Sequence, residues 1–351
     1  MGESGFLILL VVVILGFGMF FMGGNNYIVN KVYNVDVKDL ANMNVNKQNY
    51  QSVISKLTDV ANNSYLDNNP KSLNDLTTFK QTLALLETAK QFTSDSPSLY
   101  SSMGIVQNQI ASFIDLQTPN NPEIITNLEN SVTNLKQSLK LKPKDNLNLL
   151  VLVDSLIQLS QKYSNQPESA ISYANEANNN LGLIDNQTLQ VNLKILYANE
   201  AVNLANIKSV LNQANANDLY QTAITTYLSL LTKNPNDITI NTNLASCYMN
   251  QANQYLQKND TTDAIIYINQ AVNIEQKIVM LNPKDFESLN NYARDLTILA
   301  QVNQQSGNKL EAVKSYTLAL DINNRMLTLK PNDNQLLSNI STINQQLNQL
   351  K

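Results

Sequence analysis

Side chains that could perform chemistry are few in this chain. Its 351 residues include no histidine and one cysteine, Cys247. Without imidazole there is no Ser-His-Asp or Cys-His triad and no zinc site built from cysteine and histidine. Carboxylate pairs such as Asp36 with Asp39 and Asp285 with Glu287 lie at loops or helix starts, where helix capping accounts for them. We therefore expect no enzymatic activity, no metal and no cofactor.

The charge balance indicates which partners to expect. Lys and Arg number 24 against 28 Asp and Glu, so the net charge is -4 and the pI is near 5.0. A nucleic-acid partner needs a basic surface, so we expect none. Charged residues make up only 15% of the chain, which leaves a surface made mainly of amides and hydroxyls. An extracytoplasmic location and an AT-rich genome explain this composition equally well.

The N-terminal segment is the most apolar part of the sequence. Residues 6–22 read FLILLVVVILGFGMFFM, without a charge or an amide. As a helix this run, with its flanking glycines, spans about 30 Å, the thickness of a bilayer's hydrocarbon core. No basic start and no A-x-A-like cleavage site is present, which favours an uncleaved anchor over a signal peptide. Residues 1–24 are thus predicted to form a short tail and one transmembrane helix that meets lipid through Phe6, Leu10, Ile14, Phe17 and Phe21.

The orientation of this helix is set by two opposing signals. Lys31 and Lys38 weigh mildly toward a cytoplasmic C-terminal part, whereas the amide-rich composition points outward. Long domains are translocated largely regardless of charge. We therefore predict a single-pass protein of the cytoplasmic membrane whose large domain is extracytoplasmic, either periplasmic or extracellular.

Gly5 followed by Phe6 and an apolar run resembles the start of type IV pilin-like proteins, in which a leader is cut after the glycine. Leu10 stands where that family usually has glutamate, and no Lys or Arg precedes Gly5. The resemblance implies an alternative function as a subunit of a pilus-like or other surface filament. Cleavage after Gly5 stays open.

A fixed spacing of prolines organises the rest of the chain. Residues 25–46 mix Asn with Val and Tyr and predict an extended linker. From residue 47 onward the periodicity is helical. Pro235, Pro283 and Pro331 are separated by 48 residues twice over, and Pro143 follows Pro97 by 46. A period of this length predicts an array of helical hairpins.

Three local patterns identify the type of hairpin. Two of them have a small residue, an aromatic or apolar residue four positions later and a closing proline: Ala223, Tyr227, Pro235 and Ser131, Leu135, Pro143. The third is an aromatic-x2-apolar-Gly sequence that opens a first helix: Tyr100, Met103, Gly104. These patterns resemble the tetratricopeptide repeat. The resemblance implies an all-α fold, a right-handed superhelical solenoid of about six hairpins over residues 47–334, capped by a helix at 335–351. Because the last two units have 48 residues rather than 34, their helices are expected to be lengthened.

Such a solenoid carries a groove lined by the first helix of each hairpin. The family resemblance places six residues in it: Thr242, Ser246, Asn250, Asn290, Arg294 and Ile298. Arg294 could hold a carboxylate of a bound peptide, or it could be a solvated charge beside Asp295. Cys247, on an apolar helix face, is expected to be a buried structural thiol.

Together these features predict a membrane-anchored scaffold that binds another protein or organises a complex at the cell envelope. Two alternatives stay open: the surface filament subunit, and a noncatalytic accessory subunit of a membrane complex or of secretion or envelope-assembly machinery. The expected partners are one or more proteins and the lipid bilayer contacted by residues 6–22, with self-assembly possible. The sequence does not identify the protein partner, the oligomeric state or any glycosylation.

Overall fold

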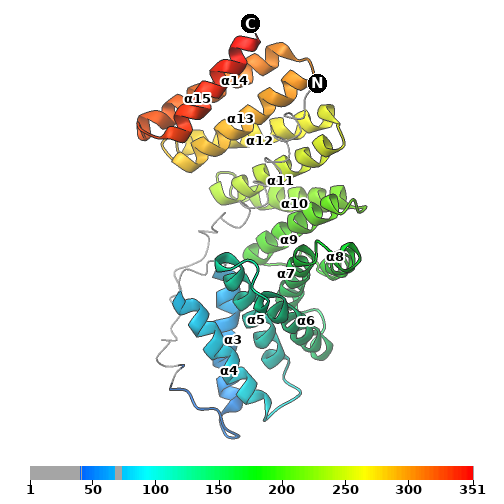
Figure 1. Ribbon diagram of the computed structural model, residues 1–351. Coiled ribbons are helices and arrows are strands. Elements are labelled where there is room, and N and C mark those ends of the chain that lie inside the picture. Colours follow the sequence, from blue (N-terminus) through cyan, green and yellow to red (C-terminus); the bar gives the residue numbers. More distant parts are fainter. Residues whose placement is uncertain (1–39, 41, 68–72, 351) are drawn as a thin grey trace. The chain divides into compact units, whose positions relative to one another are not determined.

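A computed structural model describes residues 40, 42–67 and 73–350 (Figure 1). These residues form α-helices joined by short connections and contain no strand, so the predicted all-α fold is confirmed for this part of the chain. The predicted anchor, residues 6–22, and most of the predicted linker lie outside it. No helix that is described combines the length and the hydropathy needed to cross a membrane.

The helices divide between two compact units, described separately here. The N-terminal unit, up to Leu219, holds α3 (Tyr50–Asp67), α4 (Leu73–Lys90), α5 (Pro97–Gln117), α6 (Glu123–Leu141), α7 (Asn146–Lys162), α8 (Pro167–Leu181) and α9 (Val191–Val210). The C-terminal unit, from Tyr220, holds most of α10 (Ala216–Leu231) and all of α11 (Ile238–Gln257), α12 (Thr261–Leu281), α13 (Phe286–Gln305), α14 (Lys309–Leu329) and α15 (Asn334–Gln349).

Local sequence signals set where these helices begin and end. The Ser96 hydroxyl accepts a hydrogen bond from the Leu99 backbone N–H, and Pro97 occupies the first helical position of α5. Asp side chains cap the N-termini of five later helices: Asp145, Asp237, Asp260, Asp285 and Asp333. Helices α6, α12 and α14 each end two residues before a proline, because a residue that precedes proline disfavours the helical conformation.

Close packing within a hairpin is clearest between α5 and α6. A Cβ atom added to Gly104 would lie 2.6 Å from Leu135 Cγ, so only glycine fits there. The Ser131 hydroxyl donates a hydrogen bond of 2.7 Å to the Gly104 carbonyl. The small-residue, apolar-residue and glycine signals in the sequence therefore meet at one helix crossing.

In the C-terminal unit, successive hairpins pack through small residues, and α15 follows them (Figure 1). Four alanines that recur at equivalent positions are fully buried: Ala264, Ala271, Ala312 and Ala319. Tyr292 and Tyr316 are buried beside them. Tyr267 stays half-buried and stacks on Tyr255, with ring centroids 5.4 Å apart.

The connections of this unit are held by a repeated contact. Lys277 on α12 donates to the Pro235 carbonyl, and Arg325, the equivalent residue of α14, donates to the Pro283 carbonyl at 3.2 Å. Both pairs are 42 residues apart. A cation on the second helix of one hairpin thus binds the turn that closes the preceding hairpin, and this accounts for one of the two arginines of the chain.

Candidate functional site

The first helices of neighbouring hairpins in the N-terminal unit are joined by polar side chains. Ser101 donates to Asn148 at 2.6 Å, and Ser112 and Gln158 are hydrogen-bonded at 3.2 Å. The remaining cross-helix pairs are Asn108 with Asp154, at 2.9 Å, and Lys162 with Asp115. We call these four contacts between α5 and α7 the polar ladder. Its partners are 46 or 47 residues apart, so equivalent positions of successive repeats face one another.

The ladder does not continue in the same way from α7 to α9. The same 46-residue step leads from Asp154 to Glu200 and from Lys162 to Lys208. An acid therefore follows an acid and a base follows a base. Lys208 is buried and donates instead to Asn175 on α8, at 3.2 Å. Asp154 and Glu200, which we call the acid pair, have no such substitute cation in the part of the chain that the structure describes.

Burial and mutual repulsion govern the electrostatics of the acid pair. Glu200 is 5% exposed, and its pKa is raised well above the ordinary value by desolvation and by the charge of Asp154. Desolvation also raises the pKa of Asp154, against the hydrogen bonds it accepts from Gln158 and Asn108. The buried Tyr65 on α3 has a raised pKa because of desolvation and because of both carboxylates. Desolvation thus raises the pKa of all three groups, of which Tyr65 and Glu200 are buried and Asp154 is half-buried.

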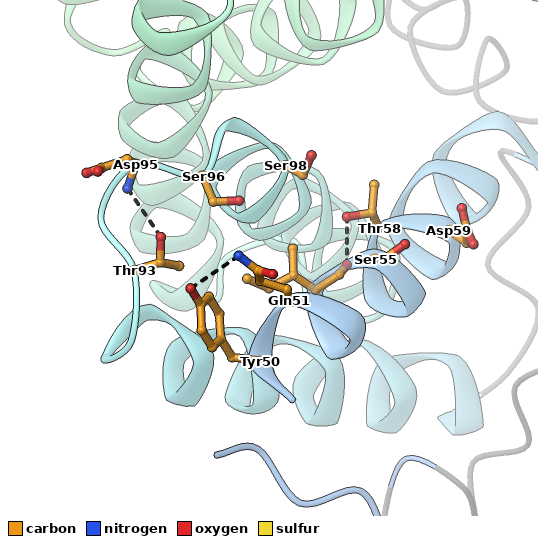
Figure 2. Close-up of a pocket in the computed structure, with 10 residues that line it drawn as sticks. Tyr50, Gln51, Ser55, Thr58, Asp59, Thr93, Asp95, Ser96 and Ser98 are labelled. Carbon is orange, nitrogen blue, oxygen red and sulfur yellow. Dashed lines mark hydrogen bonds between the residues drawn. The ribbon is translucent and has the colours of Figure 1, made fainter. Parts of the chain in front are cut away.

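A polar cleft of about 410 Å³ opens at the other end of α3 (Figure 2). Figure 2 shows Ser55, Thr58 and Asp59 on α3 at one side of the cleft and Thr93 and Asp95, on the loop before α5, at the other. The cleft offers hydroxyls and two carboxylates. No group of three or more His, Cys, Asp or Glu residues suited to a metal occurs among the residues that are placed. Its chemistry is that of hydrogen bonding to polar groups of a ligand.

The predicted groove residues lie on two helices of the C-terminal unit. Thr242, Ser246 and Asn250 follow one another at successive turns of α11 and are half-buried. On α13, Asn290 and Arg294 are exposed and Ile298 is half-buried. All six side chains are at least partly accessible: Thr242, Ser246, Asn250, Asn290, Arg294 and Ile298.

Two of these side chains have notable surroundings. The Nδ2 atom of Asn250 is buried and has no hydrogen-bond partner among the described residues. Arg294 Nε lies 2.9 Å from Asp295 Oδ1, and its side chain remains 40% exposed. Arg294 was expected either to hold a peptide carboxylate or to be a solvated charge beside Asp295, and the structure shows the contact with Asp295.

A second buried acid, not anticipated from the sequence, lies near this arginine. Glu275 on α12 is 2% exposed, and burial followed by the charge of Asp295 raises its pKa to about 8. Arg294 opposes that shift. One oxygen each of Glu275 and Asp295 is buried without a hydrogen-bond partner in the described chain. This raised pKa favours the protonated form of Glu275 at neutral pH.

The sequence predicted the buried thiol of Cys247 but did not predict the acid pair. Cys247 is fully buried as predicted, and its pKa is raised by desolvation. Asp154 and Glu200 were missed because they resemble scattered surface acids. The 46-residue step between Pro97 and Pro143, applied to Asn108, would have found both of them.

Comparisons with known proteins agree with this architecture. The family model described as "Tetratricopeptide repeat" matches residues 245–278, which span parts of α11 and α12. No curated protein sequence matches the chain. The chain therefore contains a tetratricopeptide repeat and forms a scaffold of the type suited to protein binding.

Two solved structures of one protein share this fold at low sequence identity, and a third structure aligns more weakly. The Schizosaccharomyces pombe nuclear import adaptor Nro1 aligns with a TM-score of 0.59 and 12% identity, covering 85% of this chain and 99% of Nro1. A second Nro1 structure gives a TM-score of 0.58 at the same identity, covering 85% of this chain and 94% of that one. A tetratricopeptide repeat protein from Thermus thermophilus gives a TM-score of 0.37 and 14% identity, covering 72% of this chain and 99% of that one.

Proposed function

We propose that this chain is a noncatalytic scaffold that binds another protein through the first helices of its hairpins. The observation that carries the proposal is the tetratricopeptide repeat at residues 245–278 within a succession of helical pairs. Repeat arrays of this kind present side chains from many helices along one extended surface. The half-exposed and exposed polar residues on α11 and α13 are available for such contacts.

The proposal includes attachment to a membrane through residues 6–22. It rests on the sequence alone: seventeen residues without a charge or an amide, long enough as a helix to cross the hydrocarbon core. We further propose, from the amide-rich composition, that the large domain lies on the extracytoplasmic side of the cytoplasmic membrane. The role is to bring a protein partner to the envelope or to hold a complex there.

Cell fractionation tests the attachment. The full chain is expected in the membrane fraction after high-salt and carbonate washes and in the supernatant after detergent is added. A variant lacking residues 2–24 is expected in the soluble fraction. Recovery of the full chain in sheared surface fibres would contradict the anchor and favour the filament alternative. Digestion of the large domain by protease only after lysis of the cytoplasmic membrane would contradict the extracytoplasmic location.

Affinity isolation tests the binding function. The tagged full chain, extracted from native membranes in mild detergent, is expected to bring down one or more proteins at a stoichiometry near that of the chain itself. The variant lacking residues 2–24 controls for proteins that merely share the membrane. Recovery of the chain alone under cross-linking conditions would contradict the scaffold function.

A further inference from the structure

The polar cleft beside α3 lies between the first helices of two successive hairpins. One wall is a stripe of α3 with two residues at each of three successive turns: Tyr50, Gln51, Ile54, Ser55, Thr58 and Asp59. The other wall is the segment that leads into α5: Thr93, Asp95, Ser96 and Ser98. The cleft volume of about 410 Å³ is within the range of clefts that hold ligands. The cleft is therefore part of the first-helix surface to which partner binding is assigned.

Hydrogen bonds of the lining side chains run mainly within one wall. The Ser96 hydroxyl accepts from the Leu99 backbone N–H at 3.2 Å, and the Tyr50 hydroxyl accepts a long bond of 3.4 Å from Gln51. Thr58 is hydrogen-bonded at 2.9 Å to Ser102 of α5. By contrast, four polar contacts join α5 to α7 along the polar ladder. The two walls of the cleft thus stand apart and leave room for a ligand.

Both charged side chains that line the cleft are acidic. Asp59 and Asp95 are exposed and lie on opposite sides of it (Figure 2). Neither carboxylate forms an ion pair with a Lys or Arg of the described chain, and no Lys or Arg lines the cleft. The lining therefore carries two formal negative charges and no positive one. Complementary potentials across an interface select a partner with positive charge here.

The separation of the two carboxylates sets the spacing of the charges that they can bind. The ring of Tyr50 stacks on Phe92, three residues before Asp95, with ring centroids 6.0 Å apart, so Tyr50 marks the Asp95 side of the cleft. Asp59 is nine residues further along α3, about 14 Å at 1.5 Å per residue. In an extended peptide, residues four positions apart are separated by about 13 Å and point to the same side.

We propose that this cleft binds an extended segment of the protein partner through two basic side chains four positions apart, one at Asp59 and one at Asp95. This inference rests on the proposed scaffold function and specifies the chemistry of what is bound. Between the two carboxylates, the hydroxyls of Ser55 and Ser98 are exposed and can donate to or accept from the backbone of the segment. The half-buried ring of Tyr50 packs against the aliphatic stem of the basic residue at Asp95.

Peptide libraries provide the probe. Degenerate nonapeptides, acetylated and amidated at their ends and free of other Lys and Arg, carry two fixed residues four positions apart: lysine at both, lysine at one, or norleucine at both. Norleucine keeps the aliphatic stem and lacks the charge. The mixture is passed over the immobilised full chain in mild detergent, and retained peptides are counted by mass spectrometry. One lysine is expected to give about threefold enrichment over norleucine and two lysines about tenfold, as for exposed charge pairs. Equal retention of all libraries would overturn the proposal and indicate an uncharged ligand.

Substitutions assign the enrichment to the two ends of the cleft. D59N and D95N keep the shape of the side chains, and each is expected to reduce the enrichment of the two-lysine library from about tenfold to about threefold. The combined variant is expected to show no enrichment. E168Q makes the same change of charge at an exposed position of α8, outside the cleft, and is expected to leave the enrichment intact. Loss of enrichment in E168Q to the same extent would show general electrostatic attraction and overturn the site. Circular dichroism confirms that each variant is folded.

A binding assay with the partner isolated from native membranes separates the cleft from the scaffold function. If that partner binds the combined D59N and D95N variant as well as it binds the original chain, the role of the cleft is wrong and the scaffold function stands. Weaker binding to the combined variant, with unchanged binding to E168Q, supports the cleft. If no partner is recovered with the original chain, the scaffold function fails, and the peptide libraries alone decide whether the cleft binds basic side chains.

Discussion

Replacing Glu275 with glutamine is expected to stabilise the C-terminal unit at neutral pH. In the folded protein Glu275 is 2% exposed, and its pKa is raised from 4.5 to about 8. The folded state therefore binds a proton across the window from pH 4.5 to pH 8, whereas the unfolded state has released it. Stability contributed by this group is fully present below pH 4.5 and is lost as the pH rises toward 8. Glutamine resembles the protonated acid and does not titrate.

The size of the effect follows from the two pKa values. At pH 7 the ordinary value lies about 2.5 pH units below the solution pH, and each unit corresponds to about 1.4 kcal/mol. The E275Q variant should gain about 3 kcal/mol at pH 7, less than about 1 kcal/mol at pH 5, and about 5 kcal/mol above pH 8. The dependence on pH is a firmer signature than the magnitude, since glutamine also changes the local hydrogen bonding.

Native-state hydrogen exchange of the full chain in mild detergent measures this gain directly. The opening free energies of α12 and α13 amides are compared between the original chain and E275Q at pH 5, 6 and 7, corrected for intrinsic exchange. E287Q is the matched control, because Glu287 lies near the same cluster but is exposed, and its effect should stay within about 0.5 kcal/mol. A gain that does not change with pH, or a loss at pH 7, would refute the reasoning about burial.

Three further predictions concern packing, hydrogen bonding and reactivity. G104A is expected to destabilise the protein by about 1–3 kcal/mol in urea unfolding because its new methyl group meets α6 at 2.6 Å, whereas G182A, with no heavy atom nearer than 3.5 Å, should change little. N108A removes the bond to Asp154 and should cost about 1–3 kcal/mol in the same assay; an unchanged midpoint would contradict the ladder. Cys247 should resist a maleimide in the native protein and react fully in denaturant, because it is 0% exposed and its pKa is raised; rapid native labelling would contradict its burial.

The sequence was most informative where one residue type has a strong local effect. Prolines and capping aspartates punctuate the chain, so the helical hairpins and their 48-residue spacing could be predicted. Gly104 could be recognised by its place in the repeat pattern, and its contact with Leu135 shows the steric reason for it. Prolines, capping residues and glycines act on the backbone over a few residues, so their effect can be predicted without knowing the tertiary structure.

The site was harder to predict because its chemistry depends on burial across helices. Nothing in the local sequence of Asp154 or Glu200 distinguishes them from solvated acids, and their significance arises from their equivalent positions on adjacent helices, where Glu200 is buried and Asp154 is half-buried. Glu275 became notable for the same reason. In contrast, the groove residues were chosen from the repeat pattern alone. Their accessibility agrees with that choice, but their role in binding stays a prediction.

Site-specific photo-cross-linking tests the central claim that the chain binds protein through its first helices. A photoreactive residue is placed at Ser246 on α11 or Asn290 on α13, and, for comparison, at Met280 on α12, a second-helix position that is 71% exposed. After irradiation of intact cells, a discrete protein adduct is expected from the two first-helix positions and not from Met280. Adducts only from Met280, or none from any of the three positions, would contradict the claim.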